Sequence, residues 1–348
     1  MAKIKVLDLF SGCGGLSYGF ERAGFEVVAG IDNWDDSLKT FQKNHKNAKV
    51  LNVDLSAPDI NNIKKEVGSV DVIVGGPPCQ GFSISGNRDL DDPRNKLYKG
   101  FVAIVKKFNP KVFVLENVPN LISMGQGKIK DEIISDFEKL GYSVKYKVLL
   151  ASDYGVPQNR RRVIFVGMKG MNTFNFPEPI FNNEKNKVSS YDAISDLPDK
   201  DLEDGLRYER KNLSPFQKKM ISKDLKIYNH KLTSHDNKTV KIISLVPDGG
   251  NYKDLPLEHM NSRKVHIAWT RFNSKKPSPT IDTGHRHHFH YKYNRVPTVR
   301  ESARLQSFPD SFIFLGSKTS QYKQVGNAVP PLLAEQIGKN ILRIIKKK

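Results

Sequence analysis

The chain has 348 residues, 38% of them hydrophobic and 9% aromatic, so it can bury a large core and has room for two domains. Its 56 Lys and Arg outnumber its 37 Asp and Glu, which gives a net charge of +19. Two cysteines cannot form a disulfide framework, and no apolar run reaches the length of a membrane span. This composition excludes a disordered chain, a disulfide-rich secreted domain and a membrane-spanning protein. We therefore expect a cytoplasmic protein without a signal peptide.

The positive charge is concentrated in the second half of the chain. Residues 1–166 hold 24 Lys and Arg against 19 Asp and Glu, whereas residues 167–348 hold 32 against 18. A basic surface attracts phosphate backbones but does not by itself read a sequence. The distribution favours a polyanion-binding second half, with a solvated, lysine-rich surface as the alternative.

The first 168 residues alternate apolar runs with amphipathic segments. The apolar runs are rich in β-branched residues and predict strands at Ile4–Phe10, Glu26–Ile31, Lys49–Val53, Val70–Gly75, Val112–Glu116, Val144–Leu150 and Val163–Met168. Helical spacing predicts helices at Leu16–Ala23, Asp35–Asn44, Leu97–Phe108 and Lys130–Leu140. This alternation is typical of an α/β fold with a mainly parallel, doubly wound sheet.

The regular pattern breaks near Asn172. From there to Tyr293 the chain is rich in Asn, Lys, Pro, Ser and His, with Lys241–Val246 and His266–Trp269 as the firmest element candidates. A helix is predicted again near Thr298–Leu305, and a final amphipathic helix covers Pro331–Ile345. The middle stretch is therefore expected to be a separate, loop-rich module.

The first strand ends in a glycine turn, Asp8-Leu9-Phe10-Ser11-Gly12-Cys13-Gly14-Gly15. Glycines at the end of a first strand allow a tight turn and close approach of a ligand, although a plain strand-to-helix connection explains them equally well. Asp32 ends the second strand, where a carboxylate can bind both ribose hydroxyls, and Asp54 follows the third, where it suits an adenine amine. Together these positions favour a nucleoside-bearing cofactor. Cys13 is expected to be a packing residue.

Cys79 follows two prolines at the end of the fourth predicted strand, in the sequence Gly-Gly-Pro-Pro-Cys-Gln-Gly-Phe-Ser. Prolines fix φ, so this turn is defined before any ligand binds. A thiol at such a position is exposed for chemistry, whereas a structural, buried cysteine is the alternative that the local sequence leaves open. Glu116 also ends a strand, and on its own it would pass for an ordinary carboxylate at a helix start.

These segments together resemble the DNA (cytosine-5)-methyltransferase family of bacterial restriction–modification systems. Six motifs of the family occur in order: Asp8–Gly15, Pro77-Pro78-Cys79-Gln80, Glu116-Asn117-Val118, Gln158–Arg162, Arg300–Pro309 and Gly326-Asn327-Ala328-Val329-Pro330. The resemblance covers the whole chain except about 172–293. It implies a Rossmann-like class I methyltransferase fold plus a smaller, loop-rich target-recognition domain. We expect the catalytic, cofactor-binding domain at 1–175 and 319–348 and the recognition domain at 176–318.

The resemblance also implies the chemistry. Carbon 5 of cytosine is a poor nucleophile until a thiolate adds to carbon 6, and Cys79 is the expected nucleophile. Glu116, protonated in a dry pocket, would contact the third ring nitrogen and the exocyclic amine. Arg162 would bind the base carbonyl oxygen and Arg160 would lie near the nucleophile; with period-two spacing the two share one strand face, and Arg161 points away.

The implied methyl donor is S-adenosylmethionine, with S-adenosylhomocysteine as the product and no metal. Phe10, Gly12 and Gly14 would line its methionine side, while Asp32 and Asp54 would bind ribose and adenine. Pro78 and Asn327 would complete the cofactor site. Many family members carry Glu where this chain has Asp32, followed by Asn33 and Trp34, which leaves the ribose geometry and any stacking by Trp34 open.

The expected partner is double-stranded DNA, from which the target cytosine must be flipped. The loop after Cys79 is long and polar and would close over the base, and the basic second half would contact phosphates. The candidate DNA contacts are Gln80, Ser83, Arg88, Arg94, Arg271, Arg286 and the run Lys292–Arg295. Pro277–Thr283, with Thr280, resembles the core of the family's recognition domain.

Several alternatives stay open at this point. His285, His287, His288 and His290 invite a metal site, but they lack partnering cysteines or carboxylates at fixed spacing. A tRNA methyltransferase of the same fold is a second possible function, although the Cys-Phe-Thr signature of that branch is absent. A catalytically inactive DNA-binding protein is the third. We expect a monomer acting at the bacterial nucleoid, with a cognate restriction endonuclease as a functional rather than physical partner.

Overall fold

The computed structural model describes residues 3–78, 96–170, 174–260, 269–284 and 288–346, and these form two compact units. The first unit comprises Met1–Leu150, Arg161–Glu178 and Pro331–Lys348, and the second comprises Ala151–Arg160 and Pro179–Pro330. Residues 319–330 therefore belong to the second unit, whereas the sequence interpretation grouped them with the catalytic domain. The catalytic and recognition roles of the units stay predictions.

The first unit is built on a seven-stranded sheet in the order β3-β2-β1-β4-β5-β7-β6. Its strands are β1 (Lys5–Leu9), β2 (Glu26–Asp32), β3 (Lys49–Asn52), β4 (Val72–Gly75), β5 (Val112–Asn117), β6 (Tyr142–Leu150) and β7 (Arg161–Lys169). The first five pair in parallel, and β7 lies antiparallel to both β5 and β6. The predicted mainly parallel α/β fold is confirmed.

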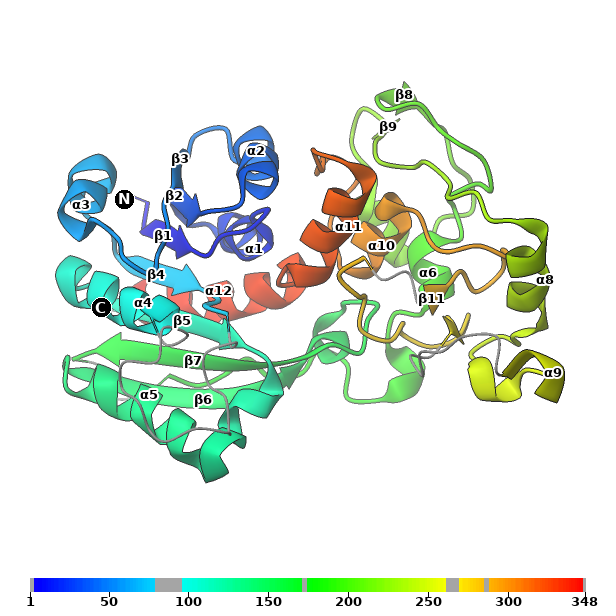
Figure 1. Ribbon diagram of the computed structural model, residues 1–348. Coiled ribbons are helices and arrows are strands. Elements are labelled where there is room, and N and C mark those ends of the chain that lie inside the picture. Colours follow the sequence, from blue (N-terminus) through cyan, green and yellow to red (C-terminus); the bar gives the residue numbers. More distant parts are fainter. Residues whose placement is uncertain (1–2, 79–95, 171–173, 261–268, 285–287, 347–348) are drawn as a thin grey trace. The chain divides into compact units, whose positions relative to one another are not determined.

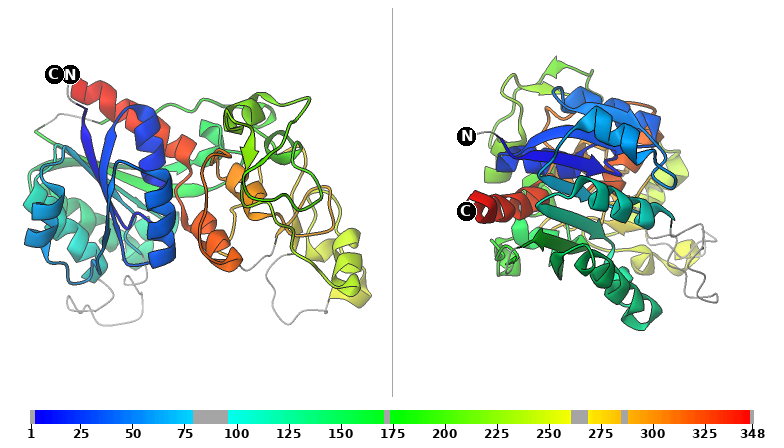
Figure 2. Two further views of the ribbon diagram at one scale, coloured as in Figure 1. Left: turned by 90° about the horizontal axis from the view of Figure 1, so that it is seen from above. Right: turned by 90° about the vertical axis from the view of Figure 1, so that its left-hand side faces the viewer.

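Helices cover both faces of this sheet (Figures 1 and 2). They are α1 (Gly15–Ala23), α2 (Asp35–Asn44), α3 (Ile60–Val67), α4 (Lys96–Phe108), α5 (Lys128–Glu138) and α12 (Pro331–Lys346). Helices α3, α4 and α5 share one core with alternate residues of the strands, such as Leu7, Leu9 and Phe113. Helices α1 and α2 cover the opposite face, where α12 packs so closely on α1 that a Cβ at Gly19 would meet Ala334 at 2.4 Å. A sheet buried on both faces explains the continuous apolar runs.

The helix that the sequence interpretation did not predict in this unit is α3, which is short and mostly exposed, with Ile63 as its buried residue. Asp59 caps it by accepting from the backbone N–H of Asn62 at 3.0 Å. The other predicted helices of this unit are confirmed with ends shifted by a few residues.

The second unit consists of short elements joined by long connections. Its helices are α6 (Ser190–Ile194), α7 (Pro215–Met220), α8 (Asn237–Leu245), α9 (Leu257–Met260), α10 (Val299–Leu305) and α11 (Lys318–Asn327). Two strand pairs accompany them, β8 (Leu206–Arg207) with β9 (Lys226–Ile227) and β10 (Thr270–Arg271) with β11 (His288–Phe289). Reciprocal side-chain caps begin α6, α7 and α10 at Ser189, Ser214 and Thr298. The predicted loop-rich character is confirmed, while α11 was not predicted.

Predicted element Lys241–Val246 is the second half of α8, whereas predicted element His266–Trp269 lies, apart from Trp269, outside the described residues. No helix in the described ranges is long and apolar enough to cross a membrane.

Candidate active site

The predicted site residues of the first unit gather at one edge of its sheet. Strands β1 to β5 run parallel, so their carboxyl ends meet at the same edge, and β7, running the other way, begins there. The strand order reverses between β1 and β4, with β2 and β3 on one side and β5 on the other. Ligands of open α/β sheets bind at such a reversal, outside the carboxyl ends of the strands.

The glycine turn after β1 has a backbone that few side chains tolerate. Phe10, Gly12 and Gly14 have φ of 56°, 53° and 94°. A positive φ is uncommon for a residue such as Phe10, and strained backbone of this kind clusters at ligand sites. At Gly12 an added Cβ would meet nothing within 4 Å, so open space lies against the turn. The turn therefore offers a cradle for a ligand.

Two carboxylates stand beside this cradle. Asp32 Oδ2 accepts the Gly12 N–H at 2.9 Å, while its Oδ1 accepts the N–H groups of Asn33 and Trp34. Asp32 thus fixes the turn to the end of β2 while staying partly exposed. Asp54 is exposed, and backbone and side-chain hydrogen bonds from Ser56 lower its pKa, which keeps it an acceptor. These two acceptors fit the hydroxyl and amine groups that a nucleoside cofactor donates.

Two further groups lie buried behind the turn. Burial raises the pKa of the Cys13 thiol to about 12, so this cysteine is a packing residue rather than a nucleophile. Burial also raises the pKa of Asp8 to about 7, although the Ser17 hydroxyl donates to its Oδ2 at 2.6 Å. Asp8 was not singled out in the sequence, because an isolated acidic residue in a strand gives no sign of its burial.

The turn that leads to Cys79 is held by the end of β5. The Asn117 side-chain amide donates to the Pro77 carbonyl at 2.9 Å, in a buried contact. Gly76, the residue before Pro77, lies against the Glu116 carboxylate. A Cβ at Gly76 would sit 2.8 Å from Glu116 Oε2. The absence of a side chain at Gly76 therefore allows Glu116 to approach the backbone three residues before Cys79.

Glu116 and Arg162 form a close ion pair at the same edge. Arg162 Nε lies 2.7 Å from Glu116 Oε1, and both side chains are largely buried, at 14% and 11% exposure. The register explains the pairing: β5 and β7 are antiparallel, with Glu116 opposite Ile164 and Asn117 opposite Val163. A second bond, from Arg162 Nη1 to the Arg161 carbonyl at 2.7 Å, further fixes the guanidinium. Two predicted catalytic side chains are thus brought together.

Arg160 and Asn327 belong to the second unit and are described there. Strand β7 begins at Arg161, so Arg160 precedes the strand on which the sequence interpretation placed it with Arg162. Arg160 is 1% exposed and donates to the Gly326 carbonyl at 2.8 Å, while Asn327 ends α11 with an exposed side chain. Arg160 therefore orients the backbone beside Asn327.

Arg271, a predicted DNA contact, is an internal residue. It is 5% exposed, and its five N–H groups are directed to the carbonyl groups of Ile243, Val246, His290 and Tyr293 and to the amide oxygen of Asn294. This saturates the guanidinium. The geometry gives Arg271 a structural role that joins α8 to β10, and we do not assign it to DNA.

Arg295, from the predicted run Lys292–Arg295, is also internal, because its guanidinium forms two bonds to Glu301, at 2.8 and 2.9 Å. His290 is fully buried between the rings of Tyr291 and Tyr293, and burial lowers its pKa to about 4. Among the described residues, no group of three or more His, Cys, Asp or Glu is arranged to hold a metal.

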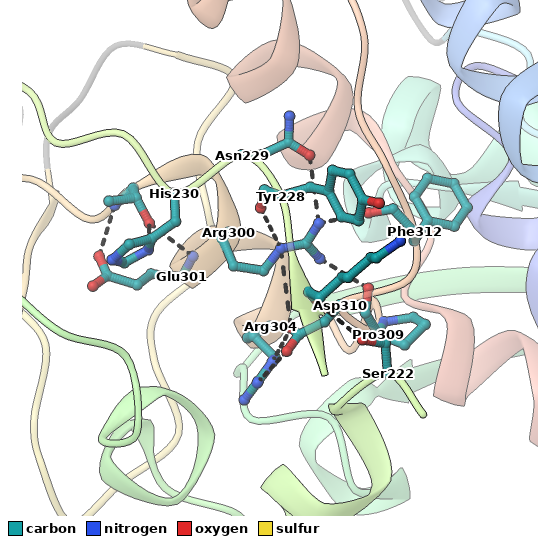
Figure 3. Close-up of polar contacts among 12 residues, drawn as sticks. Ser222, Tyr228, Asn229, His230, Arg300, Glu301, Arg304, Pro309, Asp310 and Phe312 are labelled. Atoms are coloured by element: carbon teal, nitrogen blue, oxygen red, sulfur yellow. Dashed lines mark hydrogen bonds and ion pairs between the residues drawn. The ribbon is translucent and has the colours of Figure 1, made fainter. Parts of the chain in front are cut away.

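The motif Arg300–Pro309 forms, together with Asp310, a buried charge cluster of the second unit (Figure 3). Arg304 binds both oxygens of Asp310, at 2.6 and 2.8 Å, and Arg300 donates to the carbonyl groups of Tyr228, Pro309 and Phe312. Burial lowers the pKa of Arg300 to about 10. These arginines join segments far apart in the sequence and are structural.

The remaining predicted site residues lie outside the described residues. They are Cys79, Gln80, Ser83, Arg88, Arg94 and Arg286. Pro78, the last described residue before them, is exposed.

A mainly parallel sheet with a glycine turn, acidic residues at the next two strand ends and an acid–arginine pair is consistent with a Rossmann-like class I methyltransferase fold, which a solved DNA methyltransferase structure shares. The model of the C-5 cytosine-specific DNA methylase family matches residues 4–343. The chain therefore belongs to this family and is a DNA (cytosine-5)-methyltransferase.

Similar proteins cover nearly the whole chain. The Type II methyltransferase M1.HphI of Haemophilus parahaemolyticus is 41% identical over 97% of this chain and 86% of its own length. M.DdeI of Desulfomicrobium norvegicum is 38% identical, with 97% and 88% covered. An E. coli structure, solved as a candidate DNA modification methyltransferase of a prophage, has a TM-score of 0.81 at 29% identity and covers 99% of this chain and 100% of its own. The Dnmt2 methyltransferase of S. pombe shares the fold, with a TM-score of 0.64 at 17% identity and 99% of each chain covered.

Proposed function

We propose that this enzyme methylates carbon 5 of one cytosine within a specific double-stranded DNA sequence, taking the methyl group from S-adenosylmethionine. The proposal includes flipping of the cytosine out of the duplex and transient covalent addition of Cys79. The observation that carries it is the Glu116–Arg162 pair at 2.7 Å, next to the Asn117 amide that binds the turn leading to Cys79. An acid and a fixed cation beside the turn that leads in the sequence to a thiol suit attack on an electron-poor ring.

The cofactor site proposed here uses the glycine turn and two carboxylates. Open space at Gly12 admits the methionine part, Asp32 accepts from ribose hydroxyls and Asp54 accepts from the adenine amine. When bound, the cofactor supplies an electrophilic methyl group. Phe10, Gly14 and Pro78 are proposed to complete this site within the first unit.

The protein's own groups then act on the base. Cys79 adds as the thiolate to carbon 6, and Glu116 protonates or hydrogen-bonds the third ring nitrogen, so that electron density moves to carbon 5. Arg162 stabilises the negative charge at the base carbonyl oxygen. Once carbon 5 carries the methyl group, the proton on carbon 5 is lost to water, the double bond between carbons 5 and 6 reforms and Cys79 leaves as a thiolate. The proton on the third ring nitrogen returns to Glu116.

The recognition role of the second unit rests on charge and on the relatives. The second unit, residues 151–160 and 179–330, carries 27 of the 56 Lys and Arg against 17 of the 37 Asp and Glu. The similar proteins are Type II methyltransferases, so we propose that this enzyme protects host DNA from a cognate endonuclease and acts as a monomer. Gln80, Ser83, Arg88, Arg94 and Arg286 are the proposed DNA contacts.

A duplex pool containing 5-fluorocytosine tests this function. Fluorine cannot leave carbon 5 as a proton, so a covalent protein–DNA adduct should accumulate with cofactor present. Only two thiols exist, which gives a matched pair of variants. Cys79→Ser should abolish the adduct, whereas Cys13→Ala, which alters the buried thiol, should retain it.

An adduct formed with tRNA but with no duplex would contradict the DNA substrate. An adduct that survives Cys79→Ser would contradict the nucleophile. Sequencing of 5-methylcytosine in DNA from cells that express the protein would identify the target sequence.

A further inference from the structure

His45 lies directly after α2 and is buried at 1% exposure. Its Nε2 lies 3.2 Å from the Gly14 carbonyl oxygen, and its Nδ1 lies 3.0 Å from Glu21 Oε2. With the proton on Nε2, the imidazole donates to the Gly14 carbonyl, while Nδ1 faces the Glu21 carboxylate. One imidazole thus joins the end of α2 to the glycine turn and to α1, and no motif of the family includes it.

The contact with Gly14 is a close fit of ring against backbone. Gly14 has φ of 94°, and a Cβ built there would lie 2.3 Å from His45 Nε2. The Gly14 N–H donates to the Ser11 carbonyl at 2.9 Å, and the Gly14 carbonyl also accepts the Tyr18 N–H at 2.8 Å. His45 therefore supplies a long-range contact to a peptide unit that is otherwise bonded only to residues a few positions away.

The ring is itself held by Phe41, whose centroid lies 4.3 Å from that of His45. Phe41 in turn packs on Gly30 of β2, where an added Cβ would meet the Phe41 ring at 2.4 Å. His45, Phe41 and Gly30 form a continuous layer from the glycine turn to the strand that ends at Asp32. The turn and the Asp32 carboxylate, which are proposed to bind the methionine part and the ribose of the cofactor, share this support.

We propose that His45 is a positioning residue for cofactor binding, which acts by fixing the Gly14 peptide in its left-handed conformation. This inference rests on the proposed function, because it takes the glycine turn as the S-adenosylmethionine site. His45 does not need to contact the cofactor. Preorganising the turn lowers the ordering cost of binding, so loss of the contact should weaken cofactor affinity and leave the chemical step nearly unchanged.

His45→Phe and His45→Gln test the role, because Phe keeps the ring and removes the donor whereas Gln keeps a donor. Calorimetric titration of the full-length protein with S-adenosylhomocysteine should give a Kd about tenfold higher for His45→Phe. His45→Gln should recover most of that affinity. At saturating cofactor and DNA, kcat of His45→Phe should stay within about twofold of wild type. Hydrogen exchange without ligand should be faster at the Gly14 and Tyr18 amides.

His230→Phe is the matched control, since His230 is fully buried in the second unit. Its Nε2 donates to the Pro198 carbonyl at 2.9 Å, and its Nδ1 accepts from the Thr298 hydroxyl at 3.0 Å. This variant loses a comparable interaction and should leave the Kd for S-adenosylhomocysteine unchanged. The inference is overturned if His45→Phe binds as tightly as wild type, or if His230→Phe weakens binding equally. If the wild-type protein does not bind S-adenosylhomocysteine, the proposed cofactor is contradicted. Hydrogen exchange at the Gly14 and Tyr18 amides would then still test whether His45 stabilises the Gly14 conformation.

Discussion

Replacing Asp8 by Asn should stabilise this protein, and the gain should be larger at pH 8 than at pH 5. Asp8 is 1% exposed, and burial raises its pKa from 3.8 to about 7. The Ser17 hydroxyl bonds to Oδ2, whereas Oδ1 has no hydrogen-bond partner among the described residues. Asn has nearly the same shape and can accept from Ser17 through its carbonyl oxygen, so the substitution removes the titration with little repacking.

The sign follows from where the proton binds. The folded state keeps the Asp8 proton up to about pH 7, whereas the unfolded chain loses it near 3.8. Stability is therefore full below the unfolded value, falls as the pH rises between the two values and levels off above pH 7. At about 1.4 kcal/mol per pKa unit, the two units from pH 5 to pH 7 amount to about 3 kcal/mol. The Asp8→Asn variant does not lose this stability, because Asn does not titrate.

Urea denaturation from pH 5 to pH 8 measures the effect. The chain has two tryptophans, Trp34 in the first unit and Trp269 in the second. A Trp269→Phe background leaves Trp34 fluorescence as the reporter of the unit that contains Asp8. The stability advantage of Asp8→Asn over this background should grow by about 3 kcal/mol between pH 5 and pH 8.

Asp71→Asn is the control of opposite sign. Burial alone would raise the pKa of Asp71, but the ion pair with Lys111 and the hydrogen bond from the Lys5 N–H lower it overall. The stability that Asp71 contributes is present above its ordinary pKa and is lost only at lower pH. Its variant should be less stable, with a curve parallel to that of the background from pH 5 to pH 8. An Asp8→Asn curve that is also parallel would refute the reasoning about Asp8.

Three further variants address the site and its surroundings. In Gly76→Ala the new Cβ would lie 2.8 Å from Glu116 Oε2. Steady-state methylation should therefore fall about 100-fold, while the urea midpoint changes little. An unchanged kcat would contradict the close approach of Glu116 to Gly76. Glu116→Gln should lower kcat at least about 100-fold with cofactor Kd unchanged, as titration with S-adenosylhomocysteine would check. Arg271→Ala should lower the free energy of unfolding of the second unit by about 3 kcal/mol, followed by Trp269 fluorescence, because it leaves five acceptors, three of them in buried contacts, without their donor. Unchanged stability with weaker DNA binding would restore Arg271 as a DNA contact.

The sequence by itself determined the architecture of the first unit and the class of enzyme. β-branched apolar runs between amphipathic segments predicted the parallel sheet, because a sheet covered on both faces needs strands that are apolar throughout. Glycines and carboxylates at strand ends predicted where the ligand site lies, because parallel strands end at one edge. Glu116 and Arg162 were named from motifs, and the sheet brings them together.

Only the tertiary structure decided which charged residues serve the fold. Arg271 and Arg295 resemble DNA contacts in the sequence, yet their guanidinium groups are consumed by carbonyl groups and by Glu301 inside the second unit. His45 carries no sequence signal, because its contact with Gly14 joins residues that are 31 positions apart. The pattern of apolar and polar residues in one helix or strand shows which of its side chains alternate between the interior and the surface. Whether a long polar side chain faces solvent or the interior depends on the segments packed against it, and those come from distant parts of the chain.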